Sequence, residues 1–391
     1  MIHLSQAQKS ALILSGGGAR GAYQVGVLKG LCEILKSQNI ENPFRILSGT
    51  SAGAINTAFL ATQDGAFETA VEKLIYLWSN IHTDQVFKSD LLSLNKFSLT
   101  SLLGGSNTHS PHLFSFNAIL DTSPLKKLIE ANCNFEKIQK NLNTHKYESV
   151  IITANNYIQG SAVSFIQTPD VFDSSKLEWD DSRRVSAKTE LNAQHILASS
   201  AIPMLFPPIK IGSDFYGDGC VRNHTPCSPC IRLGANHLFV IGVRSQRKNE
   251  PLIANKHENV SMIRILNTLL NAVLLDSVEQ DVHRIERINQ LIDQGQSKNS
   301  RLKKIPALCI SPSVNLGELA REKSHKLPRL LRLTISAFGH LDEASEILSY
   351  LMFEAEYCKR LIDIGYHDAL NEKKNIIEFF TTTEQQKEYT P

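Results

Sequence analysis

The same local pattern occurs twice within the first 60 residues, and it limits the fold more than any other feature of the sequence. An apolar run at residues 11–14 leads into three glycines and then into apolar residues at helical spacing. A second apolar run, at residues 44–47, leads into the turn 49–53 and again into apolar residues at helical spacing. Two successive strand–turn–helix units predict a parallel sheet covered by helices, and therefore an α/β fold.

The remainder of the chain divides into two parts. Three further strands are expected in the first part, at residues 149–154, 162–167 and 237–243. Residues 245–258 are polar and interrupt the apolar pattern, so we place a boundary there, between a first domain at 1–247 and a mainly helical C-terminal region at 248–391. Helical periodicity in the second part is clearest at residues 278–292 and 341–370.

Composition excludes several classes of function. The 391 residues carry a formal net charge of +2, which is too small to predict a nucleic-acid partner. Seven cysteines, an odd number, argue against a complete disulfide framework. The apolar run near the amino terminus is too short for a signal peptide, and no apolar stretch is long enough to cross a bilayer. We therefore expect a protein of the cytoplasm, either free or peripheral at a membrane.

The segment Gly49-Thr50-Ser51-Ala52-Gly53 has the spacing G-x-S-x-G and lies between a predicted strand and a predicted helix. A nucleophilic serine on such a sharp turn needs small neighbours, here Gly49 and Gly53. Its hydroxyl then points toward the amino terminus of the helix, where negative charge is favoured. Ser51 is thus a candidate nucleophile. In the alternative interpretation, Ser51 only caps the helix.

Three consecutive glycines, Gly16, Gly17 and Gly18, follow the other strand. Because they have no side chains, their N–H groups can line a concave surface and approach an anion closely. That anion would be the oxygen of an acyl-transfer intermediate or a phosphate. The chain lacks the Lys-Ser or Lys-Thr pair that completes a phosphate-binding P-loop, which favours an oxyanion hole. Arg20 would hold the shape of the loop or add positive potential.

Asp218 lies between two glycines, Gly217 and Gly219, directly after an aromatic pair. A carboxylate with such neighbours can approach another loop without steric conflict. Its ordinary pKa of about 4 suits proton abstraction from serine poorly, so a base at this position would need burial and direct contact with the hydroxyl. The alternative is a plain Asp-Gly turn.

Two other kinds of site are weighed against a serine–aspartate pair. His195, His224 and His237 lie where a Ser-Asp-His hydrolase would want its histidine, and they keep a triad open. Cys227 and Cys230 have the spacing of zinc or redox ligands, but no second C-x-x-C pair occurs. We interpret these cysteines as small packing residues and predict no metal site.

The combined motifs resemble the patatin-like phospholipase family. The glycine loop 16–21, the turn 49–53, the segment 198–208 and Asp218-Gly219 occur in the family's order and approximate spacing. The resemblance implies a three-layer α/β/α sandwich with a mainly parallel central sheet, in which 1–247 is the catalytic domain, plus a helical C-terminal extension. It also implies hydrolysis of fatty acyl esters in phospholipids, lysophospholipids or neutral glycerides, without a metal or other cofactor.

The same resemblance implies the roles of individual residues. Ser51 is expected to be the nucleophile and Asp218 its base, with no histidine. Gly17 and Gly18 are expected to donate N–H groups to the oxyanion, beside Gly16 and Arg20. The family usually has a glycine where this chain has Cys220. If that position requires a positive φ, a cysteine there is costly.

Two segments could connect such a hydrolase to its lipid. Residues 84–116 fit neither a helical nor a strand pattern, and we interpret them as a lid or an acyl-binding insertion, with a plain surface excursion as the alternative. The basic segment 321–332, with Lys323, Lys326 and Arg329, could lie on an anionic membrane or be an ordinary solvated helix face. No protein activator is identifiable from the sequence. A Ser-His-Asp esterase and a non-catalytic lipid- or anion-binding module remain the alternative functions.

Overall fold

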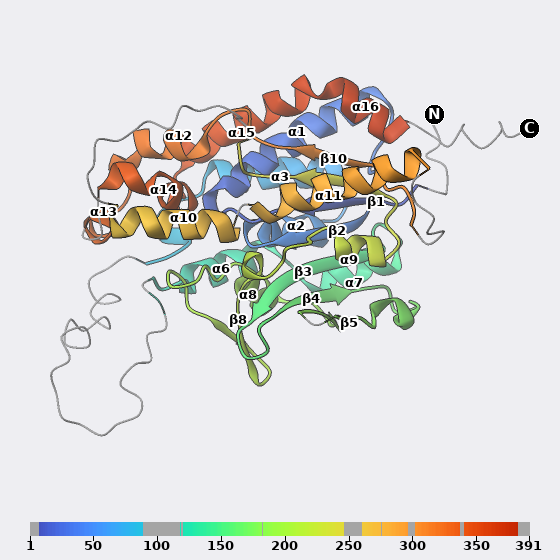
Figure 1. Ribbon diagram of the computed structural model, residues 1–391, viewed down its shortest axis with the longest axis horizontal. Coiled ribbons are helices and arrows are strands. Elements are labelled where there is room, and N and C mark those ends of the chain that lie inside the picture. Colours follow the sequence, from blue (N-terminus) through green and yellow to red (C-terminus); the bar gives the residue numbers. More distant parts are fainter. Residues whose placement is uncertain are drawn as a thin grey trace, which may run out of the picture.

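The computed structural model shows a fold built around one sheet that is covered by helices (Figure 1). The described residues are 8–88, 118, 120–181, 183–245, 260–274, 276–295, 302–336 and 340–381. Within these residues the sheet has ten strands in the order β10-β9-β1-β2-β3-β4-β6-β5, with β8 paired to β3 and β7 to β8. Their bounds are β1 Ser10–Leu14, β2 Phe44–Thr50, β3 Ser149–Asn156, β4 Ser161–Gln167, β5 Asp180–Asp181, β6 Arg184–Lys188, β7 Ile209–Ile211, β8 Asp214–Asp218, β9 His237–Ile241 and β10 Ala307–Ile310.

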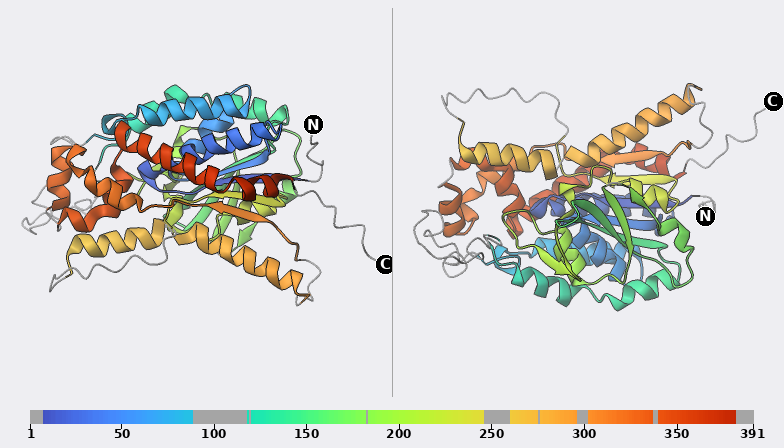
Figure 2. Two further views of the ribbon diagram at one scale, coloured as in Figure 1. Left: turned by 90° about the horizontal axis from the view of Figure 1, so that it is seen from above. Right: turned by 60° about the horizontal axis from the view of Figure 1, so that its bottom comes forward.

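The helices cover both faces of this sheet (Figure 2). The α-helices are α1 Gly21–Ser37, α2 Ala52–Thr62, α3 Phe67–Ser79, α6 Ser123–Asn132, α7 Glu136–Asn143, α8 Ala193–Ser199, α9 Ser228–Arg232, α10 Met262–Leu274, α11 Asp276–Asp293, α12 Leu316–Glu322, α13 Arg329–Ser336, α14 Ser345–Leu351, α15 Ala355–Asn371 and α16 Lys373–Thr381. Short 3₁₀ helices are η1 Gly18–Arg20, η2 Thr83–Gln85, η3 Ser174–Leu177, η4 Gly219–Val221, η5 Ser324–Lys326 and η6 Leu341–Ala344.

The predicted α/β/α sandwich with a mainly parallel sheet is confirmed. Strands β10, β9, β1, β2 and β3 run parallel, whereas β4 and β8 are antiparallel to β3. The side chains of β1 alternate between two hydrophobic layers: Leu12 and Leu14 pack on the face covered by α1, α2 and α15, and Ala11 and Ile13 on the face covered by α9 and α11. Burial on both faces explains why β1 is a continuous apolar run without polar alternation.

The region after residue 247 is mainly helical, as expected, but it also supplies a strand that the sequence did not reveal. β10 extends the sheet by pairing parallel to β9. Helix α15 packs along α1 so closely that two glycines have no room for a side chain. A methyl group on Gly26 would lie 2.0 Å from the Ile362 carbonyl oxygen, and one on Gly365 would lie 2.2 Å from the Tyr23 carbonyl oxygen. This region therefore shares the sheet and the hydrophobic core of the first 245 residues.

Two of the segments expected to matter lie largely outside the described residues. The proposed lid is described only at 84–88, where Lys88 forms an isolated bridge to Asp121. The boundary expected around residue 247 falls in 246–259, which is also outside them. In the part of the chain that the structure describes, no helix combines the length and the apolar character needed to cross a membrane.

Candidate active site

Ser51 lies on the sharp turn between β2 and α2. Its backbone has φ 55° and ψ −123°, a conformation that costs a non-glycine residue about 1–3 kcal/mol. A methyl group on Gly49 would lie 2.3 Å from the Gly53 carbonyl oxygen, and one on Gly53 would lie 2.1 Å from that of Leu14. The two outer positions of G-x-S-x-G therefore have no room for a side chain. The Ser51 hydroxyl makes no capping bond to α2, which excludes the interpretation of Ser51 as a helix cap.

Asp218, the last residue of β8, lies directly against this serine. The Ser51 hydroxyl donates a hydrogen bond of 2.6 Å to Asp218 Oδ2, and the Cys220 N–H donates to Oδ1 at 2.9 Å. The carboxyl group is fully buried. Burial raises the pKa of Asp218 to about 6, although the hydrogen bonds from Ser51 and Cys220 oppose the shift. Asp218 therefore does more than cap the Asp-Gly turn that follows it, because its carboxylate also contacts the Ser51 hydroxyl.

The backbone of Ser51 is held by a residue that the sequence did not single out. The Ser51 N–H donates to Ser199 Oγ at 2.9 Å, and the Ser199 hydroxyl donates to the Thr153 carbonyl oxygen at 2.6 Å. Ser199 ends α8 and thereby links that helix to the turn and to β3. It lies in the segment 198–208 that carries the family resemblance, but no local pattern distinguishes it from Ser200 beside it.

The glycine loop lies directly beside the serine. A methyl group on Gly16 would be 2.9 Å from the Ser51 Cβ atom, so only glycine permits this approach. Gly18 has φ 57°, and a methyl group there would lie 2.3 Å from the Tyr350 carbonyl oxygen of α14. Gly17 and Gly18 stand at the start of η1, where N–H groups have no acceptor within the helix. They follow Gly16, which lies against Ser51, and this position suits donation to a developing oxyanion.

Arg20 attaches this loop to helix α14. Its side chain is buried, with Nε donating to Ser349 Oγ at 2.8 Å and the guanidinium paired with Glu346. The guanidinium also lies over the Tyr350 ring, 5.0 Å from the centroid. Because Glu346 neutralises the Arg20 charge, the contacts favour a role in fixing the shape of the loop over a role in adding positive potential.

Cys220 does not strain the loop after Asp218. The described non-glycine residues with positive φ are Asn39, Ser51, His145 and Met204, so the backbone of Cys220 is ordinary. The concern that a cysteine is costly at this position is therefore unfounded. The thiol fills space beside the glycine loop, since a methyl group on Gly16 would lie 2.4 Å from Cys220 Sγ. Burial, reinforced by the nearby Asp218 carboxylate, raises the pKa of this thiol well above its usual range.

The three candidate histidines lie away from the serine–aspartate pair. His195 is buried against Phe165, its Nδ1 accepts from the Asn192 N–H at 3.1 Å, and burial lowers its pKa to about 4. His224 is exposed. His237 begins β9, at the opposite end of the parallel sheet from the turn that follows β2.

The C-x-x-C pair belongs to the hydrophobic layer under α11. Cys227 and Cys230 are fully buried free thiols, and the Cys227 N–H donates to Asp281 at 3.0 Å. Across the described ranges, no three His, Cys, Asp or Glu side chains form a group that could hold a metal ion. The cysteines therefore act as packing residues.

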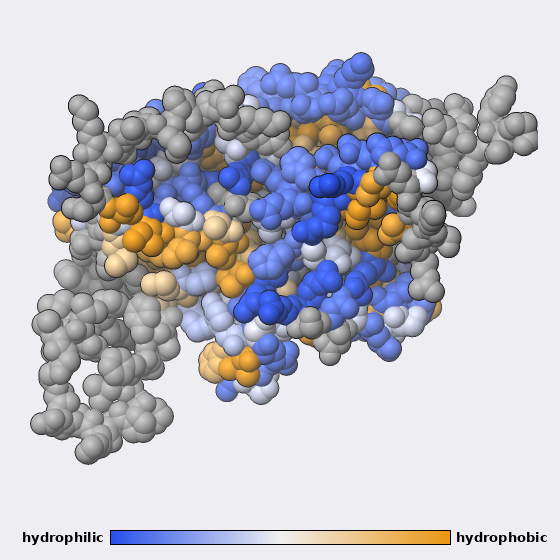
Figure 3. All heavy atoms as spheres, viewed as in Figure 1, coloured by the Kyte–Doolittle hydropathy of each residue, from blue (hydrophilic) through white to orange (hydrophobic). Residues whose placement is uncertain are grey.

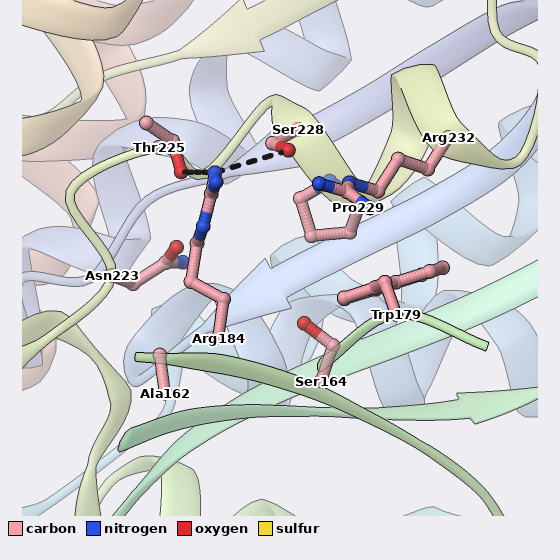
Figure 4. Close-up of a pocket in the computed structure, with 9 residues that line it drawn as sticks. All are labelled: Ala162, Ser164, Trp179, Arg184, Asn223, Thr225, Ser228, Pro229 and Arg232. Carbon is pink, nitrogen blue, oxygen red and sulfur yellow. Dashed lines mark hydrogen bonds between the residues drawn. The ribbon is translucent and has the colours of Figure 1, made fainter. Parts of the chain in front are cut away.

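A small pocket lined by both polar and apolar side chains lies on the face of the sheet opposite α2 (Figure 4). Arg184 reaches across it and donates to Thr225 at 2.9 Å and to Ser228 at 3.4 Å. Asn223 also lines it and donates to the hydroxyl of Thr50, the residue before Ser51, at 3.3 Å. Through Asn223 the pocket adjoins the turn that carries Ser51, but neither Ser51 nor Asp218 lines it.

Comparison with known proteins gives relatives encoded by viruses. The chain is 26% identical to a probable lipid hydrolase, 463L, of Invertebrate iridescent virus 6, over 313 residues that cover 75% of this chain and 88% of that protein. It is also 26% identical to the uncharacterized protein R571 of Acanthamoeba polyphaga mimivirus, over 217 residues. That match covers 55% of this chain and 59% of R571, less than two thirds of the relative.

Matches among solved structures include bacterial and human proteins. VipD from Legionella pneumophila matches with a TM-score of 0.34 and 11% identity, over 94% of this chain and 67% of that chain. Human GIVD cytosolic phospholipase A2 matches with a TM-score of 0.40 and 11% identity, over 96% of this chain and 60% of that chain. The model of the family described as "Patatin-like phospholipase" matches residues 12–231, more than half of the chain. This protein belongs to the patatin-like phospholipase family.

Proposed function

We propose that the protein is a lipid acyl hydrolase that cleaves fatty acyl esters with Ser51 as nucleophile and Asp218 as base. One observation carries this proposal: the Ser51 hydroxyl donates a hydrogen bond of 2.6 Å to a fully buried carboxylate. A serine on a strained turn, in contact with a base and beside a glycine loop, is the arrangement that acyl transfer requires.

The reaction proceeds through an acyl-enzyme. Asp218 accepts the Ser51 proton as the oxygen attacks the ester carbonyl, and the N–H groups of Gly17 and Gly18 stabilise the oxyanion. The tetrahedral intermediate collapses, and the alcohol leaves with the proton held by Asp218. Water then attacks the acyl-enzyme, Asp218 accepts its proton, and Ser51 recovers that proton as the fatty acid is released.

Burial prepares Asp218 for this role. The pKa of about 6 brings its proton affinity closer to neutrality than that of an exposed aspartate, while leaving it ionised at pH 7. Each well-placed oxyanion donor contributes about 3 kcal/mol in the transition state. The start of α2, which follows Ser51, adds a favourable potential for the same charge.

The substrate class we propose is a phospholipid or a lysophospholipid. The support is the family to which the chain belongs and the description of a viral relative as a probable lipid hydrolase. A Ser-His-Asp triad has less support, because His195, His224 and His237 are engaged or placed elsewhere. A binding module without catalysis would have no need for the contact between Ser51 and Asp218.

Fatty acid release from phosphatidylcholine and lysophosphatidylcholine by the purified full chain tests this proposal. Release should be abolished by Ser51→Ala and unaffected by Ser10→Ala, which removes an equally buried serine at the other end of the sheet. Alanine at each of the three histidines should leave release intact. Undiminished release by Ser51→Ala would reject the assignment of the nucleophile.

A further inference from the structure

Helix α10 presents an apolar side to solvent in addition to the one that it buries. Within Met262–Leu274, Ile263, Leu270 and Leu274 are buried in the core. The exposed side chains are Met262, Ile265, Thr268, Leu269, Ala272 and Val273, and none of them is charged. Four of these, Met262, Ile265, Leu269 and Val273, recur at helical spacing and form what we term the apolar stripe. Figure 3 shows the resulting band of apolar surface over α10.

The apolar stripe lies next to the proposed active site. Helix α10 contacts η4, the turn that directly follows Asp218. It also contacts α14, whose Tyr350 carbonyl oxygen lies against Gly18 of the glycine loop. The elements that hold the base and the oxyanion donors therefore both border α10.

A second exposed apolar group lies near Asp218. Tyr157 and Ile158, in the turn between β3 and β4, and Phe215 of β8 form what we term the apolar tip. Tyr157 donates its N–H to the Phe215 carbonyl oxygen at 2.9 Å. The Tyr157 hydroxyl lies against Gly217, the residue before Asp218, and fills the space that a methyl group on this glycine would need. Figure 3 shows apolar surface at this end of the molecule on the same side as α10.

We infer that the apolar stripe and the apolar tip together dock the protein on a lipid bilayer, with the proposed active site between them. This inference rests on the proposed function, because it supplies the route by which a membrane lipid reaches Ser51. Exposed helices that are apolar on their outer side and lie beside a site for lipids suit insertion into the bilayer interface. Aromatic rings such as Tyr157 and Phe215 are typical of that interface.

Charge supports a phospholipid surface as the occupant. No exposed side chain of α10 is acidic, and beside the apolar tip the exposed Lys210 places its ammonium 6.0 Å from the Phe215 ring centroid. Arg264, next to the apolar stripe, is paired with Glu343 at 3.9 Å and adds little net charge. A protein partner is less suited to the stripe, since interface hot spots are enriched in Trp, Tyr and Arg and the four residues of the stripe present only aliphatic and thioether groups.

The basic segment 321–332 is a weaker candidate for membrane contact. Lys323 and Lys326 both pair with Glu356, at 2.6 and 3.1 Å. Leu327 and Leu331 are buried in the core and leave little apolar surface for insertion. We therefore assign the docking role to α10 and the apolar tip.

Co-sedimentation of the full chain with vesicles of equal parts phosphatidylcholine and phosphatidylserine tests this inference. The protein compared throughout carries Ser51→Ala, so that binding is measured whether or not the protein is a hydrolase. Adding Ile265→Glu and Leu269→Glu together should weaken binding by about tenfold or more, because two inserted side chains are replaced by charges. Ile158→Glu should weaken it independently.

Leu291→Glu provides the matched control. Leu291 is 41% exposed on α11 and Leu269 is 58% exposed on α10, so both substitutions place a charge at an exposed leucine of neighbouring helices. Only the change on α10 should reduce binding. In the protein that retains Ser51, the paired α10 changes should reduce hydrolysis of vesicles while leaving hydrolysis of a soluble short-chain ester unchanged.

Three results would overturn the inference. One is absence of vesicle binding by the parent protein, and another is equal loss of binding by the α10 and Leu291 variants. The third is a parent protein that sediments as a dimer and becomes monomeric on the α10 changes without any loss of vesicle binding, which would assign the stripe to a second copy of the chain.

Leu269→Trp gives a second measurement: its fluorescence should shift to the blue with vesicles. If vesicle binding behaves as predicted but no ester is cleaved, the proposed function fails and the docking surface stands.

Discussion

The buried carboxyl group of Asp218 makes the chemistry of Ser51 dependent on pH. Since burial raises its pKa to about 6, the base is protonated below that pH and available above it. We predict that kcat/KM for a soluble ester rises with pH through about 6 and then reaches a plateau. A rise centred at about 4, the ordinary range of aspartate, would contradict the assigned environment of the base.

The same shift predicts a cost in stability. The folded-state pKa of Asp218 is raised above its unfolded value of about 4, so the folded state retains the proton over the pH range in which the unfolded state loses it. Its contribution is therefore favourable at low pH and is lost as pH rises through about 6. Asp218→Asn, which cannot ionise, should unfold at a higher urea concentration than wild type at pH 8 and lose that advantage at pH 4. A stability difference that does not depend on pH would contradict this.

Cys220 contributes to the same titration. Its N–H and its thiol both donate to the Asp218 carboxylate and lower the pKa that burial raises. Cys220→Ala removes the thiol donor, so the rising limb of the pH profile should move to higher pH. Cys133→Ala, at a buried cysteine directly after α6, should leave the profile in place. A shift to lower pH in Cys220→Ala would show that the thiol acts mainly by excluding water.

At the scale of elements, the glycine loop depends on its attachment to α14. Arg20→Met removes one partner of a buried ion pair and leaves Glu346 without its cation, which should destabilise the fold by about 3–5 kcal/mol. Lys36→Met, which breaks the exposed pair with Glu68, should leave the urea midpoint nearly unchanged, because solvent screens that pair. Urea unfolding of both variants checks the contrast. Equal effects would mean that Arg20 is not held as described.

The elements that the sequence predicts are those whose signal is local. The strands β1 and β2 and the turns after them combine an apolar run with glycines, and Gly49 and Gly53 are required by contacts within their own turn and with β1. β10 escapes prediction because it has only four residues, Ala307–Ile310, and becomes a strand by pairing with β9 far away in the sequence. The role of Ser199 is hidden for the same reason: both of its partners, Ser51 and Thr153, are distant along the chain.

At the scale of the whole molecule, the C-terminal region is part of the folding unit. It completes the sheet with β10 and covers α1 with α15, where Gly26 and Gly365 allow backbone contact. A fragment ending at residue 245 would expose this face of α1, so we predict that it fails to give a cooperative unfolding transition. The full chain should show a single transition by circular dichroism. A fragment that folds cooperatively by itself would contradict the shared core.

The central claim is that Ser51 is a nucleophile activated by Asp218, and labelling with a fluorophosphonate probe tests it most directly. The wild type and Ser10→Ala should be labelled, with the probe located on Ser51 by mass spectrometry. Ser51→Ala and Asp218→Ala should both remain unlabelled, because one lacks the nucleophile and the other its base. Wild-type protein that does not react, or Asp218→Ala that reacts as fast as wild type, would contradict the account.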